Sequence, residues 1–442
     1  MSYKNYFILL SSILLALITL SFFLPLLSYQ EARRIVIVQE GFLRLSLIPT
    51  FNGEPYFTKP PLYTWISLPF FAIGYPWGGE IFTMRLISIL CYVGVSYLLY
   101  LILKKDIRKT LLTLLILLSS FRFFSFLFRI DLEPLFIFFT TLNFYFLLKH
   151  RENPIPFNSY LFYISFTLAF LVRGPLHFFL IPALLFLAIT LRDKGLLRLL
   201  YFLPGWAIFI ILITPWFLYG YLVYGKEVFS HLLQTDLAER LTAKGDPFYY
   251  YIKAFVLNFA PYLFLTLYGF RSLKKVFRET EVEGKIYLGS FTIPIILLSF
   301  TGEKFDKYLL FLYPLASLFF ANILLKLYNE RILFGLGLIM VLLNFIFISG
   351  IHLHQRGEIN FKMSLWKKNL LPKENYHFFK EVPSFALYLL KKPCPIIREE
   401  DSIKELKRGS FLISSSEIKD LTPKLVLPDP YKKGKFWYVY ER

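Results

Sequence analysis

Long apolar runs recur along this chain as far as about residue 350, and they restrict its fold more than any other feature. The runs near 7–27, 81–103 and 332–350 each approach or exceed the roughly 18–20 residues that cross about 30 Å of hydrocarbon as a helix. With 56% hydrophobic residues and a mean hydropathy of +0.54, the chain has more apolar surface than one soluble core can hide. The runs lack the alternation of membrane-spanning strands. We therefore expect an all-α polytopic membrane protein.

The apolar runs, taken in order, predict about eleven transmembrane helices. The others lie near 110–128, 134–148, 159–172, 175–191, 199–221, 251–271, 286–300 and 308–325. The two runs that meet at Arg173-Gly174-Pro175 have the pattern of broken or re-entrant helices. The first run lacks a small-x-small cleavage site, so we expect it to be retained as the first helix.

Basic residues predict the orientation of the chain in the cytoplasmic (inner) membrane. They gather in the loops at 104–109, 149–151, 192–198 and 271–278. By the positive-inside rule these loops and the amino terminus face the cytoplasm. The alternate segments are then extracytoplasmic, which applies to 28–80, 222–250, 301–307 and everything after about 351.

The apolar fraction falls after about residue 351, which predicts a change from membrane to soluble structure. Residues 411–414 and 436–440 have the composition of strands, and 403–407 has that of a helical stretch. We therefore expect a transmembrane domain at 1–350 and a small extracytoplasmic α/β domain at 351–442.

The net charge of +19 does not indicate a nucleic-acid-binding protein, because the basic residues are dispersed between apolar runs instead of gathered on one solvated face. We interpret the excess as a topological signal and as attraction to anionic lipids and phosphate groups. The two cysteines, Cys91 in an apolar run and Cys394 in the polar tail, are not expected to form a disulfide.

The first extracytoplasmic loop, at 28–80, is too long for a simple connector, and loops of this length are usually functional. Its first part has apolar residues at helical intervals and predicts an amphipathic helix at the membrane surface. The loop resembles the first loop of the aminoarabinose transferase and protein-mannosyltransferase-like family. The resemblance rests on Gln30-Glu31-Ala32-Arg33 and on Asn52-Gly53-Glu54-Pro55-Tyr56-Phe57-Thr58-Lys59-Pro60-Pro61-Leu62.

Weaker matches follow in family order and cover most of the membrane portion. They are Arg85-Leu86, Arg129-Ile130-Asp131-Leu132-Glu133-Pro134, the segment that ends at Arg173-Gly174-Pro175, Pro215-Trp216, and Lys304-Phe305-Asp306-Lys307-Tyr308. The resemblance implies the membrane glycosyltransferase fold termed GT-C. It also implies an inverting transfer of a sugar from a polyprenyl phosphate, such as undecaprenyl phosphate, to a lipid, glycan or protein acceptor on the outer, periplasmic side.

Transfer from a phosphate-linked sugar leaves charge on the departing phosphate, which nearby cations stabilise. The resemblance assigns this binding to basic residues that all fall in or beside extracytoplasmic segments: Arg33, Lys59, Arg173, Arg240, Lys304 and Lys307. An alternative for Arg33 and Lys59 is that they anchor a surface helix at the interface. Lys304 and Lys307 could instead be solvated lysines of a short loop.

Two carboxylates are the expected catalytic residues. Asp131 lies in a very short turn between apolar runs, where ionisable residues are rare and tend to be functional. Glu31 stands in the family's acidic pair and could orient or deprotonate an acceptor hydroxyl. Their alternatives are a solvated turn for Asp131 and a helix-capping carboxylate for Glu31.

The chain departs from the family pattern where a metal would bind. The family's acidic pair begins with Asp, but this chain has Gln30 there, so Glu31 would act alone or with Asp131. Thr58 replaces a Glu that is a candidate metal ligand, and Leu237 replaces a frequent His. His231 lies nearby but is not aligned. Since zinc needs such ligands, we expect no metal and no other cofactor.

Two other functions remain open. The losses at Gln30 and Thr58 also fit an inactive family member that only binds a lipid-linked sugar. A transporter or flippase could use the same cations and spans, although no inverted repeat is evident. No Gly-rich phosphate loop is present, in agreement with a donor that carries its own lipid. The sequence names neither the sugar nor the acceptor, which could be lipid A, another glycolipid, a polysaccharide or a protein.

Overall fold

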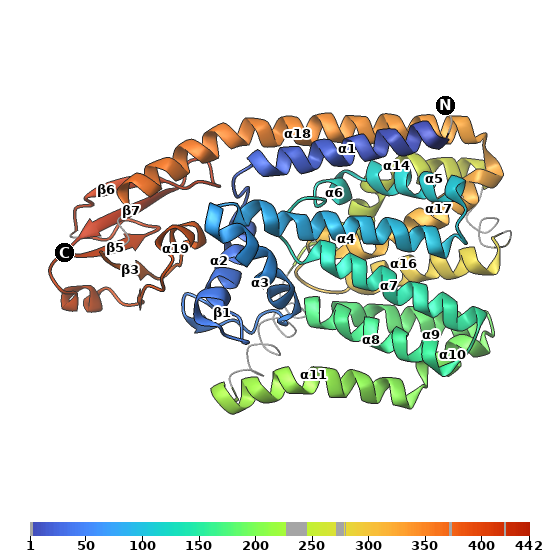
Figure 1. The fold of residues 1–442 in the computed structure, drawn as a ribbon, viewed down its shortest axis with the longest axis horizontal. Coiled ribbons are helices and arrows are strands. Elements are labelled where there is room, and N and C mark those ends of the chain that lie inside the picture. Colours follow the sequence, from blue (N-terminus) through green and yellow to red (C-terminus); the bar gives the residue numbers. More distant parts are fainter. Residues whose placement is uncertain (1–2, 227–244, 271–277, 279, 371–373, 420) are drawn as a thin grey trace. The chain divides into compact units, whose positions relative to one another are not determined.

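The computed structural model describes residues 3–226, 245–270, 278, 280–370, 374–419 and 421–442 (Figure 1). The chain divides into two compact units. The helical unit comprises Met1–Ile18, Phe57–Tyr63 and Leu86–Phe347, and the sheet unit comprises Thr19–Tyr56, Thr64–Arg85 and Ile348–Arg442. The first loop is therefore divided between the two units. Residues 57–63, which include Lys59, belong to the helical unit, and the residues before and after them belong to the sheet unit.

Each apolar run predicted to span the membrane lies largely on helix. The helices are α1 (Tyr3–Phe23), α4 (Glu80–Ile102), α5 (Ile107–Ser119), α6 (Phe121–Phe124), α7 (Glu133–Glu152), α8 (Pro156–Arg173), α9 (Leu180–Thr190), α10 (Lys194–Leu200), α11 (Leu203–Tyr224), α14 (Tyr250–Phe270), α16 (Val282–Ser299), α17 (Tyr313–Leu327) and α18 (Glu330–Asn369). The prediction of an all-α polytopic membrane portion is confirmed.

Eight helical stretches among the described residues are long and apolar enough to cross a membrane. They are Tyr3–Phe23, Glu80–Ile102, Pro156–Thr190, Lys194–Tyr224, Tyr250–Gly269, Val282–Ser299, Asp306–Leu327 and Glu330–Asn369. Pro156–Thr190 joins two of the predicted runs. The helices α5, with 13 residues, and α7, with basic residues in its last turn, fall outside these eight. The described stretches are three fewer than the predicted eleven, because two runs are joined in Pro156–Thr190, α5 is short and α7 has charged ends.

Aromatic side chains fill the spaces between the helices of the helical unit. One cluster joins α8 and α11 through rings of Phe166, Phe178, Trp206 and Phe209. Another joins α14, α16 and α17 through Phe255, Phe259, Phe291 and Phe320. The pairs of the first cluster are mostly edge-to-face and those of the second mostly stacked, arrangements in which aromatic rings bury large areas.

The predicted break at Arg173-Gly174-Pro175 is present. Helix α8 ends at Arg173, and Gly174 has a φ of 74°, a conformation that L side chains rarely adopt. A 3₁₀ helix, η2 (Gly174–Phe179), follows with Pro175 in its first turn, where a missing N–H costs nothing. The chain leaves the α8 axis at this point, so Arg173 lies at a helix end.

The sheet unit contains a five-stranded mixed sheet (Figure 1). Its strands are β3 (Asn375–Phe379), β4 (Ile396–Ile397), β5 (Ser410–Ser414), β6 (Leu425–Pro428) and β7 (Phe436–Glu441), in the order β4-β3-β5-β7-β6. β3 is parallel to β4 and β5, whereas β7 is antiparallel to β5 and β6. The small C-terminal domain and both predicted strands are confirmed.

Other predicted features of the carboxyl-terminal part differ in detail. The helical stretch predicted at 403–407 is a 3₁₀ helix, η5 (Asp401–Glu405). Helix α18 runs through the expected domain boundary at 351 and ends at Asn369, before β3 begins. The helix therefore leads directly from the membrane portion to the sheet.

The first part of the long loop forms α2 (Tyr29–Arg44), as its periodicity predicts. Residues Ile35, Val36, Ile37 and Val38 are all buried, and Val36 joins the core formed by Trp366, Phe385 and the sheet. Successive residues turn by about 100° around a helix, so four buried positions in a row mean that α2 is enclosed on all sides there. The predicted helix is present, and its location at the membrane surface stays a prediction. Its partner in the sheet unit is α19 (Ser384–Leu390).

A short hairpin after α2 is joined to the carboxyl-terminal segment. Its strands are β1 (Thr50–Phe51) and β2 (Glu54–Pro55), and Asn52 and Gly53 between them both have positive φ. The Asn52 amide donates to the Cys394 carbonyl and accepts from the Cys394 backbone N–H, each at 2.8 Å. The Glu40 carboxylate accepts from the backbone N–H groups of Asn52 and Gly53. Cys394, like Cys91, is a free thiol.

Candidate active site

Four charged side chains form one cluster in the helical unit. We call Asp131, Glu133, Arg173 and Lys307 the carboxylate–cation cluster. The Lys307 ammonium lies 3.6 Å from Asp131 Oδ2 and 3.4 Å from Glu133 Oε1, and Arg173 Nη1 lies 2.5 Å from the same Glu133 oxygen. Asp131, Arg173 and Lys307 were predicted from the sequence as site residues. They come from segments more than 40 positions apart, and the fold brings them together.

The start of α7 positions the two carboxylates. Asp131 lies in the turn before the helix, and its Oδ1 accepts the backbone N–H of Leu132 at 2.8 Å. Glu133 and Pro134 form the first turn, where the helix dipole stabilises negative charge. Both carboxylates are buried. Their geometry is therefore set by backbone structure and not by flexible loops.

Glu133 is a functional candidate that the sequence interpretation did not single out. Its side chain is 1% exposed, and Oε1 is shared by Arg173 and Lys307. Its Oε2 is buried and accepts no hydrogen bond from the described residues. A buried carboxylate oxygen without a donor is costly, which is consistent with a place reserved for a ligand donor. The signal in the sequence was a second carboxylate two positions after Asp131.

Arg173 and Lys307 differ in how far they are exposed to solvent. Arg173 is buried, and its guanidinium carbon lies 4.8 Å from the centre of the Tyr308 ring. The Lys307 side chain is 18% exposed and extends from η4 (Asp306–Leu312). Since both contact Glu133, this carboxylate holds two cations side by side, an arrangement suited to binding a phosphate.

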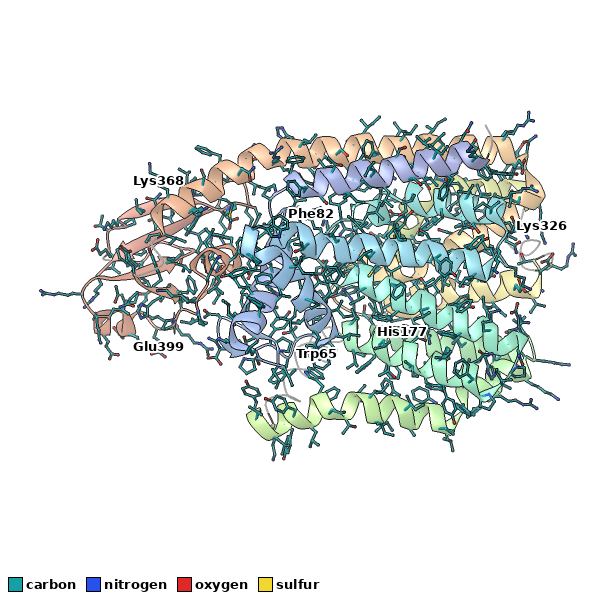
Figure 2. All side chains as sticks on the ribbon, viewed as in Figure 1. Trp65, Phe82, His177, Lys326, Lys368 and Glu399 are labelled. Atoms are coloured by element: carbon teal, nitrogen blue, oxygen red, sulfur yellow. The ribbon has the colours of Figure 1, made fainter. Side chains whose placement is uncertain are left out.

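His177 holds the η2 turn near this cluster. Its ring lies inside the helical unit (Figure 2), with Nδ1 3.3 Å from Thr140 Oγ1 and Nε2 3.3 Å from Asn143 Oδ1. Thr140 and Asn143 are on α7, the helix that begins with Glu133. These contacts tie the turn after Arg173 to the helix that carries its carboxylate partner.

Lys59 is buried in the segment 57–63 of the helical unit. Pro60 lies beside the η2 turn. A Cβ added to Gly174 would lie 3.8 Å from two atoms of the Pro60 ring. Phe57 contacts the rings of Trp216 and Tyr224 on α11. The motif that carries Lys59 is thus packed next to the residue that follows Arg173. A buried lysine differs from the alternative of an exposed interface anchor.

Lys304 does not join the carboxylate–cation cluster. Its buried ammonium donates to the carbonyl oxygens of Asp246 and Thr301 at 2.8 and 2.5 Å, and lies 3.4 Å from that of Gly302. These contacts close a turn. This arrangement supports a structural role, which differs from the phosphate contact expected from the sequence.

Glu31 lies in the sheet unit and is paired with Arg85. Its Oε2 accepts from Arg85 Nη2 at 3.1 Å and from the Leu27 backbone N–H at 2.6 Å. Arg85 is fully buried and also donates to three carbonyl oxygens, those of Ser21, Leu24 and Pro25. The Glu31 carboxylate neutralises the buried guanidinium of Arg85. Because Glu31 lies in the first turn of α2, its position also fits the helix-capping alternative.

Arg33 belongs to a second basic group in the sheet unit. Its guanidinium carbon lies 4.8 Å from the centre of the Tyr29 ring and 5.9 Å from that of Phe51. The neighbouring Arg34 donates to the Tyr56 hydroxyl at 3.4 Å. Burial raises the pKa of Tyr56, but the positive charges of Arg34 and Arg33 outweigh it, so that the net shift is downward. A phosphate-binding role for Arg33 stays a prediction.

Arg240, His231 and Leu237 lie outside the described residues. Within the described ranges, no three His, Cys, Asp or Glu side chains come together as a metal site. Asp131 and Glu133 are paired with cations, and Thr58 offers no carboxylate, so the described residues do not fit a zinc ion. The absence of a bound metal remains a prediction.

Sequence comparison supports the resemblance. Residues 58–219 match the sequence model of the family described as dolichyl-phosphate-mannose-protein mannosyltransferase. An uncharacterised protein of Aquifex aeolicus (strain VF5) is 30% identical over 284 residues, which are 63% of this chain and 55% of that protein. A second uncharacterised protein of the same strain is 24% identical over 386 residues, 84% of this chain and 86% of that protein. The chain thus spans about half the length of the first relative.

The fold matches two crystal structures of ArnT from Cupriavidus metallidurans. The structure bound to undecaprenyl phosphate has a TM-score of 0.83 at 13% identity and covers 99% of this chain and 98% of that one. The structure in the apo state has a TM-score of 0.81 at 14% identity with the same coverage. The chain therefore has the GT-C fold of the aminoarabinose transferase and protein-mannosyltransferase type, as its motifs predict.

Proposed function

We propose that this chain is a membrane glycosyltransferase that moves a sugar from a polyprenyl phosphate to a lipid, glycan or protein acceptor on the outer face of the cytoplasmic membrane. The observation that carries the proposal is the carboxylate–cation cluster beside the turn that packs against the Lys59 motif. The fold supports it, since a structure of the same fold is bound to undecaprenyl phosphate.

In the proposed reaction, an acceptor oxygen attacks the anomeric carbon of the sugar as the bond from that carbon to the phosphate oxygen breaks. The bonding electrons leave with the phosphate, so a phosphodiester with one negative charge becomes a monoester with about two. Asp131 takes the proton of the acceptor hydroxyl. Attack from the face opposite the phosphate inverts the anomeric centre.

Cations supply the electrostatic part of the mechanism. Arg173 and Lys307 are held together by Glu133 before any donor binds, so they need little rearrangement to meet the phosphate. Lys59 adds a third positive charge from the family motif. In a water-poor site such charges stabilise a developing dianion far more than they would in bulk water.

Asp131 is the better candidate for the base than Glu31. The Glu31 carboxylate is 1% exposed and accepts from the fully buried Arg85 and from the Leu27 backbone N–H, so its contacts neutralise a buried guanidinium and do not face an acceptor. We therefore assign Glu31 a positioning role at the start of α2. Asp131 contacts Lys307, whose side chain is 18% exposed. An acceptor can therefore approach Asp131 from the side of this lysine.

The proposal is tested by mass spectrometry of lipid-linked sugars and glycolipids from cells with and without this gene. The expected result is accumulation of one polyprenyl-phosphate sugar and loss of one glycosylated product when the gene is absent. Identical lipid-linked sugar and product profiles in the two strains would contradict the proposal.

Lys59→Ala is expected to reduce transfer by about 10²–10³-fold, because removing one preorganised group that stabilises developing charge has this effect in other enzymes. Lys59→Arg should keep part of the activity, since it keeps the charge. Transfer is measured as loss of the donor by purified protein, with Lys367→Ala on α18 as a control of matched chemistry. Wild-type activity in Lys59→Ala would remove the phosphate role.

A further inference from the structure

A cavity of about 680 Å³ lies in the helical unit at the end of α7 opposite the carboxylate–cation cluster. The α7 residues of its lining come 12 to 19 positions after Glu133, which places the cavity about 18–28 Å from the cluster along the helix. Its walls come from the ends of α4 and α7 and from the first turns of α16. They comprise Tyr97, Leu101, Ile102, Lys104, Lys105, Tyr145, Leu148, Lys149, Arg151, Glu152, Glu283 and Tyr287.

Positive charge exceeds negative charge in this lining, with four basic and two acidic side chains. Lys104 pairs with Glu152 at 3.2 Å and with Glu283 at 3.7 Å, and Lys149 pairs with Glu152 at 3.5 Å. No ion pair joins Lys105 to a carboxylate of the described residues. The two acids of the lining pair with Lys104 and Lys149, and Arg151 pairs with Asp193 outside the lining at 2.5 Å. The charge of Lys105 therefore remains to meet an anion.

The turn that carries two of these lysines has an unusual backbone. Lys104 and Lys105 have φ values of 56° and 66°, in the left-handed region that glycine or asparagine usually occupies. The turn closes α4 through bonds from their N–H groups to the carbonyls of Leu101 and Tyr100. Lysines at two consecutive positions of this kind are unfavourable for the backbone, and such strain concentrates at functional sites.

The remaining walls are apolar or aromatic, which makes the cavity amphipathic. Leu101, Ile102 and Leu148 continue the apolar surfaces of α4 and α7, and Tyr97 on α4 is 61% exposed. Tyrosines next to lysines are the composition found at the headgroup level of a bilayer. The lysine loops at 104–109 and 149–151 are also those expected to face the cytoplasm.

We propose that this cavity, lined by Lys104, Lys105, Lys149 and Tyr97, binds the headgroup of an anionic phospholipid from the cytoplasmic leaflet. A free phosphate ion would gain nothing from the apolar walls, and a zwitterionic lipid gains little from an excess of positive charge. Basic pockets between helices on the cytoplasmic side have this specificity for acidic lipid headgroups. The site is separate from the proposed transfer reaction at the other end of α7.

The test is native mass spectrometry of the full chain in detergent, titrated with phosphatidylglycerol or with phosphatidylcholine of the same acyl chains. The wild type should prefer phosphatidylglycerol. Lys105→Gln should weaken phosphatidylglycerol binding about fivefold, the effect of one cation near a lipid surface. Glu283→Gln removes an acid from the same lining and should strengthen it. The control Lys194→Gln, on α10 outside the lining, should leave it unchanged.

Opposite shifts in Lys105→Gln and Glu283→Gln cannot come from partial unfolding, since unfolding would weaken binding in both. Equal binding of the two phospholipids would overturn the proposal, as would unchanged affinities in both variants. In a further arm, inorganic phosphate at millimolar concentration is added. Loss of the phosphatidylglycerol preference in its presence would indicate a simple anion site and would overturn the assignment to lipid.

Discussion

Asp131→Asn is expected to reduce sugar transfer by about 10²–10⁴-fold, the usual contribution of a positioned base. Asparagine keeps the size of the side chain and its contact with the Leu132 N–H, but it cannot take a proton. The rate is measured with purified protein as release of polyprenyl phosphate from the donor. Transfer by the wild type should survive strong chelation, because cations instead of a metal meet the departing phosphate in this account.

Asp193→Asn is a matched control for this experiment. Asp193 is also an aspartate held by a cation, Arg151 at 2.5 Å, but it precedes α10 in a loop expected to face the cytoplasm. It should keep wild-type transfer. An Asp131→Asn variant as active as the wild type would show that the base is elsewhere. Chelator-sensitive transfer restored by zinc would contradict the metal-free mechanism.

Arg85→Met is expected to lower the free energy of unfolding by about 3–5 kcal/mol, because it leaves the buried Glu31 carboxylate without its counter-charge. The double variant Glu31→Gln with Arg85→Met should lose less than the sum of the single losses, since it removes both charges. Unfolding in detergent by heat or denaturant measures both. Additive losses would contradict an energetic coupling between these two side chains.

The same double variant separates the two roles considered for Glu31. A positioning residue acts through the structure around it, so a double variant that recovers stability should also recover transfer. A base cannot be replaced by glutamine. A stable double variant with transfer as low as that of Asp131→Asn would return Glu31 to the catalytic residues.

The length of the apolar runs and the Gly-Pro sequence after Arg173 were sufficient to predict the helices and the broken helix. These are local features, because a helix satisfies its own backbone groups and needs only about 20 apolar residues to cross a membrane. The strands β5 and β7 were also predicted, since they have local β-propensity. β3, β4 and β6 were missed, and their sequences are short or contain polar and proline residues.

Pairings between distant residues could not be predicted from local pattern. Asn52 and Cys394 are 342 positions apart, and the periodicity of α2 does not reveal that it joins the core of the sheet unit. The polar residues of α2 give it the pattern of a helix with one exposed face, yet much of the helix is buried by segments far away in the sequence.

Lys304 and Lys307 show the same limit within one loop. They are three positions apart and looked equivalent in the sequence. Since η4 begins at Asp306, Lys304 stays in the preceding turn among carbonyl oxygens, whereas Lys307 extends from the helix to Asp131 and Glu133. The position of one helix start thus separates a lysine of the turn from a lysine of the candidate site.

The most direct test of the proposed transfer uses purified chain in liposomes that contain a polyprenyl-phosphate sugar with a label in the sugar and a second label in the lipid. Membrane extract supplies the acceptor. The account predicts that the sugar label moves to a product while free polyprenyl phosphate appears, and that Asp131→Asn abolishes both changes. Movement of the intact donor across the bilayer with both labels still joined would contradict it and identify a transporter. Binding of the donor without cleavage in the complete mixture would identify an inactive binding protein.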